Sequence, residues 1–274
     1  MNVRTTHSIL LPFEPSRDGF VFRNSFSWTE ADLSFLAQRY RTLTSGAVGL
    51  VGALGGGLAG GVLGRVAGGV AAGALGRAGV GDGLLRAAVK QWSGFGLCGG
   101  MALSAIERWP GTNRVPTSAL KPGPMRTLLW RRQQQTLDAS LVTFARVWIR
   151  VRFVPGNVPH APFADELNRQ LDRIQETLTS GRPALVGLVG DAPDPFALHQ
   201  VVVFGIERRG DLSATLSVYD PNAPGRTRHI VTRPAPMPGR TCLTTDMPTG
   251  PTTTGRCHIS TRAGELSHLF EIRL

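Results

Sequence analysis

Cysteine is scarce in this sequence of 274 residues, which has three: Cys98, Cys242 and Cys257. A disulfide scaffold of this size needs several bonds, whereas here at most one can form. A bond between Cys242 and Cys257 would leave Cys98 as a lone thiol, and the same count fits a reducing compartment with no bond. A disulfide-stabilised scaffold is therefore excluded, and the pairing of Cys242 with Cys257 stays open.

Lysine is scarcer still. Lys90 and Lys121 are the only lysines, so 28 of the 30 basic residues are arginine, and the net charge is +11. A nucleic-acid-binding protein usually clusters its basic residues on one helix or stripe with aromatic partners, whereas these arginines are scattered. The densest group lies within a helical pattern and is interpreted as a solvated helix face: Arg131, Arg132, Arg146, Arg150 and Arg152. We expect no nucleic-acid partner.

Metal-binding and dinucleotide-binding patterns are also missing. His258 lies beside Cys257 without the paired spacing of a zinc site, and four further histidines are scattered: His7, His160, His229 and His268. The glycine tract contains GxGxxG-like strings, but no strand leads into a Rossmann turn with an acidic residue at the proper distance. We expect no metal and no cofactor.

The N-terminal residues lack a long hydrophobic run. The apolar residues 9–11 are stopped by Pro12, so no secretory signal is visible. We expect a cytoplasmic protein, or one that is exported without a visible signal peptide.

Glycine, in contrast, is abundant, and much of it lies in a Gly/Ala-rich insert at residues 46–83. Residues 46–64 carry no charge, and nine of these nineteen are glycine, several of them four residues apart as in packed membrane helices. Each glycine weakens a helix by about 1 kcal/mol relative to alanine. Two interpretations stay open: an insert or helical hairpin packed on a soluble body, or an element that contacts the membrane.

The order of the expected elements indicates an α+β protein. Helical periodicity predicts helices at 29–43, 98–109, 125–150 and 163–180. Short β-rich runs predict strands at 183–190, 199–207, 212–220, 228–232, 257–262 and 268–274, with a loop at 233–255. Because helices come first and strands follow, we expect one two-lobed domain over residues 1–274, with a helical lobe at 84–181 and a β-sheet lobe at 182–274.

Cys98 lies in GFGLCGGMALSA, where a glycine-rich loop becomes a helix. A helix N-terminus presents free N–H groups and a positive dipole, which favour the thiolate of a cysteine placed there. Gly99 and Gly100 are expected to leave room for a substrate backbone. A buried, inert cysteine is the alternative, because free cysteine is among the most buried residue types.

A base and an orienting carboxylate are found in one predicted hairpin. If its turn is residues 208–211, Glu207 faces Leu212, and the same register places His199 directly opposite Asp220. Directly opposed residues share a face, with Cβ atoms about 4.5–5.5 Å apart. The register predicts that Asp220 holds the His199 imidazole, with Asn222 as the alternative orienter.

These segments, GFGLCGGMALSA, HQVVVFGIE and LSVYDPNAPG, resemble the papain-like cysteine peptidase superfamily, particularly bacterial proteins of the C39-like kind. They also resemble a group of bacterial proteins with a GLCGGM segment and a later YDPN. The match covers roughly residues 91–225, in the order Cys, His, Asp. The resemblance implies a papain-like α+β fold in which Cys98 is the nucleophile, His199 the general base and acid, and Asp220 the orienter.

One feature departs from the superfamily, which usually places an oxyanion-hole glutamine six residues before the cysteine. That position is Trp92 here, and Gln91 is one residue further away, so it can serve only if the loop bulges. Asn24 is the other candidate to join the backbone N–H of Cys98.

The expected function is acyl transfer through a thioester, on a peptide or protein substrate. Peptide or isopeptide hydrolysis is the default outcome, and deamidation or transamidation would use the same triad. Two alternatives remain: a membrane-associated interaction or effector protein that uses residues 46–83, with an inactive or secondary papain-like part, and a folded, non-catalytic relative.

Overall fold

The structure is a computed structural model that describes residues 7–26, 29–32, 34, 35, 38, 96–109, 117–153, 164–190, 199–209, 213–234, 241–246, 259–261 and 264–274. The chain forms two compact units, one of residues 1–24 and 97–274 and one of residues 25–96. The first unit holds the helices and the sheet described below. The insert expected at 46–83 lies outside the described residues, and so does part of the helix expected at 29–43.

Three helices of the first unit confirm the sequence expectation: α5 (Cys98–Arg108), α6 (Pro122–Phe153) and α7 (Ala164–Thr179). The four apolar residues of the α7 pattern are each 1% exposed or less: Leu167, Leu171, Ile174 and Leu178. The helix ends at Thr179, and two residues later Gly181 has a φ of 78°, the left-handed conformation that glycine adopts readily. Short turns of helix lie at α1 (Pro15–Asp18) and η2 (Thr117–Ala119).

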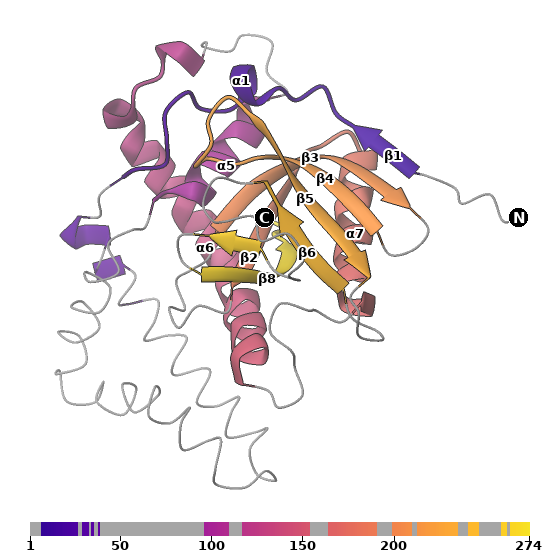
Figure 1. Cartoon of the computed structure of the whole chain (residues 1–274). Helices are drawn as coiled ribbons and strands as arrows, with labels where there is room; N and C mark the ends of the chain where they lie inside the picture. Colours follow the sequence, from indigo (N-terminus) through magenta and orange to yellow (C-terminus); the bar gives the residue numbers. More distant parts are fainter. Residues whose placement is uncertain are drawn as a thin grey trace, which may run out of the picture. The chain divides into compact units, whose positions relative to one another are not determined.

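Among the described residues, eight strands form one sheet with antiparallel pairing throughout, in the order β6-β5-β4-β3-β2-β8-β7, and β1 also pairs with β3 (Figure 1). The bounds are β1 (His7–Leu10), β2 (Ala184–Gly190), β3 (His199–Arg209), β4 (Ser213–Tyr219), β5 (Thr227–Pro234), β6 (Thr241–Thr245), β7 (Ile259–Thr261) and β8 (Gly264–Glu271). The fold class is α+β, as expected.

Two strands were not expected from the sequence. β1 lies in a segment with only a short apolar run, and it pairs with the second half of β3, beyond the part that pairs with β2. β6 lies inside the expected loop at 233–255, so that expectation was wrong. One apolar side chain of β6, Leu243, is fully buried, and pairing with β5 supplies the backbone hydrogen bonds.

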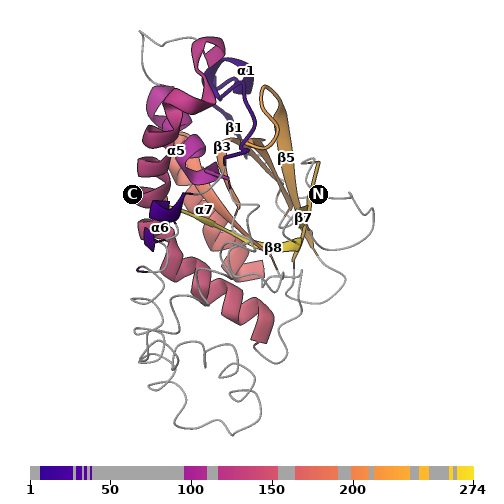
Figure 2. The same ribbon diagram turned by 90° about the vertical axis from the view of Figure 1, so that its left-hand side faces the viewer.

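The helices cover both faces of the sheet. Along β2, Val186 and Leu188 belong to the apolar core that includes α7, whereas Leu185 and Val189 belong to the core that includes α5 and α6. Figure 2 shows α5 and α6 together on one side of the strands. The sheet therefore has one apolar face for each helix layer, with α7 on one face and α5 and α6 on the other.

Among the described residues, no helix is both long enough and apolar enough to cross a membrane.

Candidate active site

Cys98 is the first residue of α5, directly after the N-cap residue Leu97. The expectation that it begins a helix is confirmed, and the residue is 7% exposed. This position places its sulfur at the positive end of the helix dipole, where the first turn also presents backbone N–H groups.

The two glycines after Cys98 bring α5 close to its neighbours. A Cβ on Gly100 would lie 2.0 Å from the carbonyl oxygen of Leu129 in α6, and a Cβ on Gly99 would lie 2.3 Å from the side chains of Gln200 and Thr136. The expectation that both glycines leave room for a substrate backbone was therefore wrong. They are buried, and what approaches them is α6 and β3, which fixes the position of the Cys98 end of the helix.

His199 is the first residue of β3, and Asp220 directly follows β4. Nε2 of His199 lies 2.8 Å from Oδ1 of Asp220, and the two side chains are 10% and 0% exposed. Because Nε2 is engaged by the carboxylate, Nδ1 is the ring nitrogen left for Cys98, the other residue with which the imidazole interacts. The structure thus brings the three predicted triad residues together.

The register that produces this contact differs from the predicted one. Glu207 pairs with Thr215, three residues further along the chain than the predicted Leu212. The register then shifts by one at Phe204, which has no partner between the pairs Gly205 with Ser217 and Val203 with Val218. Such a bulge changes the pairing of the β3 residues from Val203 back to His199 by one, so their side chains lie on the opposite face from the one that the register of Gly205–Arg209 would give them.

The bulge at Phe204 is what puts the base and the carboxylate on one face. Beyond it, Val202 pairs with Tyr219, so the same register extended by one residue sets Asp220 opposite Val201. His199 lies two residues from Val201 and therefore points to the same side as Asp220, in a diagonal relationship. Without the bulge, the spacing would be odd and the two side chains would point to opposite faces.

The charges of the site favour a protonated imidazole. Burial alone would lower the pKa of His199, but the charge of Asp220, its hydrogen bond and the interaction with Cys98 together raise it from 6.5 to about 10. Oδ1 of Asp220 also accepts a hydrogen bond from the Asn222 N–H at 2.8 Å. Oδ2 is buried with no hydrogen-bond partner among the described residues. The positive charge of the His199 ring, which contacts Oδ1, compensates the charge of this carboxylate.

Asn24 also lies at the site. Its Oδ1 accepts a hydrogen bond from the Leu97 N–H, and its Nδ2 donates to Oδ1 of Asn222 at 3.2 Å. Asn222, the alternative orienter, therefore contacts Asn24, while the bond to His199 is made by Asp220. Gln91, the other oxyanion candidate, lies outside the described residues.

Two buried glutamines beside Cys98 were not found from the sequence. Oε1 of Gln133 accepts a hydrogen bond from the Gly100 N–H at 3.0 Å, and so holds the first turn of α5. Gln200 is fully buried against Gly99, and neither end of its amide has a hydrogen-bond partner among the described residues. Gln133 belongs to no local motif, and Gln200 follows His199 in HQVVVFGIE without any sign of its contact with Gly99, so only the packing of α5 on α6 and β3 shows where the two side chains lie.

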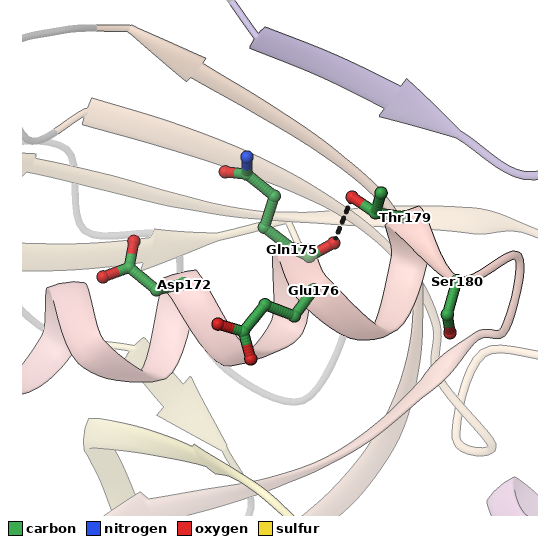
Figure 3. Close-up of a pocket in the computed structure, with 5 residues that line it drawn as sticks. All are labelled: Asp172, Gln175, Glu176, Thr179 and Ser180. Carbon is green, nitrogen blue, oxygen red and sulfur yellow. Dashed lines mark hydrogen bonds between the residues drawn. The ribbon is translucent and has the colours of Figure 1, made fainter.

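A surface depression of about 480 Å³ lies elsewhere, along α7 (Figure 3). It is lined by Asp172, Gln175, Glu176, Thr179 and Ser180. All come from one helix and the residue after it, and Asp172 is paired with Arg208 of β3. No triad residue lines this depression, so it does not serve the candidate active site.

Within the described ranges, no three His, Cys, Asp or Glu side chains gather as a metal ion would require. Cys257 and His258 lie outside these ranges, and so does any bond between Cys242 and Cys257.

Comparison of the chain with protein-family models, curated proteins and solved structures finds no match. Cys98, His199 and Asp220 are therefore the residues whose chemistry indicates a function.

Proposed function

We propose that this protein is a papain-like cysteine peptidase, or a related thiol acyl-transfer hydrolase, that acts on peptide, isopeptide or amide bonds. One observation carries the proposal: the His199 ring bonds a buried Asp220 carboxylate through Nε2 and also interacts with Cys98. A nucleophile, a base and an orienter in contact are the parts that covalent acyl transfer requires. The papain-like assignment is supported by the cysteine at a helix start packed on an antiparallel sheet.

In the first step, the Cys98 thiolate attacks the substrate carbonyl carbon and a carbon–sulfur bond forms. Because the pKa of His199 is about 10, the ring is protonated at neutral pH, and its positive charge pairs with the thiolate in this step. The negative charge that develops on the carbonyl oxygen is stabilised at the N-terminal end of α5. His199 then gives its Nδ1 proton to the leaving amine as the carbon–nitrogen bond breaks, which leaves a thioester on Cys98.

In the second step, the neutral His199 ring removes a proton from water as the water oxygen attacks the thioester. The carbon–sulfur bond breaks, the acid product leaves and the ion pair returns. An amine in place of water gives transamidation, and a glutamine side chain as the substrate gives deamidation. Throughout, Asp220 holds the Nε2 proton, so the ring presents Nδ1 to the sulfur in both steps.

The test is product analysis with a complex peptide mixture. Wild type, Cys98→Ala, His199→Ala and Cys242→Ala are incubated with it, and mass spectrometry records new termini, deamidated side chains and new amide links. Intact-mass spectra of acid-quenched samples record an acyl group on Cys98. Products from wild type and Cys242→Ala, and none from Cys98→Ala, are expected.

A second probe tests the proposal even if the protein accepts only a few peptide sequences as substrates. A library of peptidyl vinyl sulfones should label Cys98 of the folded wild type and fail to label His199→Ala. If the wild type gives no products, no acyl-enzyme and no labelling that depends on His199, the proposal is wrong.

A further inference from the structure

Asn24 makes hydrogen bonds to both halves of the candidate site. Its Oδ1 accepts from the N–H of Leu97, the residue before Cys98. Its Nδ2 donates to Oδ1 of Asn222, and its own N–H donates to the Pro221 carbonyl at 3.1 Å. One side chain therefore connects the start of the Cys98 helix to the turn that follows Asp220.

The two connected segments are far from Asn24 in the sequence. The bond to Leu97 spans 73 residues and the bond to Asn222 spans 198. Asn222 in turn donates its N–H to Oδ1 of Asp220, the oxygen that His199 contacts. A displacement of Asn24 would therefore act on the nucleophile through Leu97 and on the orienter through Asn222.

The segment that carries Asn24, residues 13–24, is itself anchored on the sheet. The Phe13 ring stacks on Phe204 with centroids 5.2 Å apart, at the bulge of β3. The Phe20 N–H donates to the Tyr219 hydroxyl at 3.0 Å, and Tyr219 directly precedes Asp220. These contacts fix the position from which Asn24 reaches Leu97 and Asn222.

We infer that Asn24 is a positioning residue, which sets the distance between Cys98 and the His199–Asp220 pair; this inference rests on the proposed function. It assigns Asn24 a role different from the oxyanion donor expected from the sequence. Its oxygen already accepts the Leu97 N–H and one of its two amide N–H groups already donates to Asn222, so bonds to protein groups at both ends fix the orientation of the amide.

Alkylation of Cys98 by iodoacetamide separates the two roles. The thiolate displaces iodide from a saturated carbon, so no oxyanion forms, and an oxyanion donor has no part in the reaction. A positioning residue does affect it, because it places the sulfur beside His199. Loss of positioning is expected to slow the alkylation of Cys98 roughly tenfold or more near neutral pH.

The variants are Asn24→Ala, Asn24→Asp and, as a matched control, Asn168→Ala, which removes an asparagine of α7 near Arg208. Asn24→Ala should be slow. Asn24→Asp keeps an acceptor for the Leu97 N–H and can accept from Asn222 if that amide turns over, so it should recover most of the wild-type rate. Near-ultraviolet circular dichroism confirms that each variant is folded.

If folded Asn24→Ala is alkylated at Cys98 at the wild-type rate, the inference is wrong. It is also wrong if Asn168→Ala slows the alkylation of Cys98 as much as Asn24→Ala does. If Asn24→Ala unfolds, the folded Asn24→Asp variant decides: a rate near that of the wild type supports positioning, and a loss as large as that of His199→Ala contradicts it. Failure of the proposed function gives a different result, because His199→Ala would then alkylate at the wild-type rate.

Discussion

Asp220 holds the His199 ring with one carboxylate oxygen, while its other oxygen is buried without a hydrogen-bond partner among the described residues. A fully buried carboxylate is costly unless a cation or several donors compensate it. Here the compensation comes from one backbone N–H and from the imidazolium of His199. The pair is therefore interdependent, and removal of either partner should change both the stability and the reactivity of the site.

The first prediction concerns how stability depends on pH. The pKa of His199 is raised in the folded protein from 6.5 to about 10, so between these values the folded state keeps a proton that the unfolded chain has lost. The stabilisation from this group is fully present below about pH 6.5 and is lost as the pH rises toward 10. The melting temperature of the wild type should therefore fall across this range.

Asp220→Asn provides the comparison for this prediction. It keeps the shape of the side chain but removes the charge that raises the pKa of His199, so its melting temperature should fall less steeply between pH 6.5 and 10. Differential scanning fluorimetry on both proteins at the same ionic strength gives the two slopes. Equal slopes would show that the His199 proton does not contribute to stability.

The second prediction concerns the reactivity of Cys98. Iodoacetamide reacts with thiolates, and the His199 cation favours the thiolate of its neighbour. His199→Ala should slow alkylation of Cys98 roughly tenfold or more near pH 7, and Asp220→Asn should give a smaller loss because the ring remains. Quantitative peptide mapping after timed labelling gives the rates, with Cys242 and Cys257 of the same sample as internal references. A Cys98 rate that is unchanged in His199→Ala would contradict the ion pair.

The contact between His199 and Asp220 could be predicted from the sequence, although the register behind it could not. The two strands are visible in the sequence as β-rich runs. The first run starts at His199 and the second ends directly before Asp220, so the two polar residues lie at the end of the hairpin away from its turn. Gly205 directly follows Phe204, and a glycine inside a strand is a common sign of a bulge, but it does not by itself show which residue is left unpaired or how the register shifts. At the end of the hairpin that carries His199 and Asp220, the predicted register was wrong by two residues. Because side chains alternate along a strand, an error of two still leaves His199 and Asp220 on the same face of the sheet.

The roles of the residues that support the site could not be predicted, because they arise from contacts between distant segments, and Asn24 was expected as an oxyanion donor. Gln133 meets Gly100 across 33 residues, and Asn24 meets Leu97 across 73. The sequence around Gly99 and Gly100 suggests space for a substrate, but a glycine pair alone does not show which neighbour approaches it. The helices were predicted more reliably from their periodicity, because the burial of α7 requires only that its apolar residues lie on one face of the helix.

The third prediction concerns the anchor of residues 13–24. Tyr219→Phe removes the acceptor of the Phe20 N–H, and both residues are fully buried. A buried donor left without a partner costs about 1–3 kcal/mol. The free energy of unfolding, measured by urea denaturation, should fall by that amount. Val21→Ala, in the same segment but 45% exposed, is the control and should change stability little; an equal loss in both variants would mean that the hydroxyl is not what anchors the segment.

The fourth prediction concerns the close approach of α5 and α6. A Cβ on Gly100 would lie 2.0 Å from the backbone oxygen of Leu129, and a backbone atom cannot turn aside as a flexible side chain can. Gly100→Ala should therefore force α5 away from α6 and destabilise the protein by about 1–3 kcal/mol or more. Because Cys98 begins this helix, its alkylation should also slow toward the rate of His199→Ala.

Gly123→Ala is the matched control, since Gly123 is also a helical glycine but a Cβ added there would have nothing within 4 Å. Alanine is the better helix former by up to about 1 kcal/mol, so this variant should be as stable as the wild type or slightly more so, with unchanged alkylation of Cys98. Urea denaturation and timed labelling on the two variants separate the steric effect from the general effect of replacing a glycine. If Gly100→Ala matched Gly123→Ala in both measurements, the contact with Leu129 would not be what sets the position of Cys98.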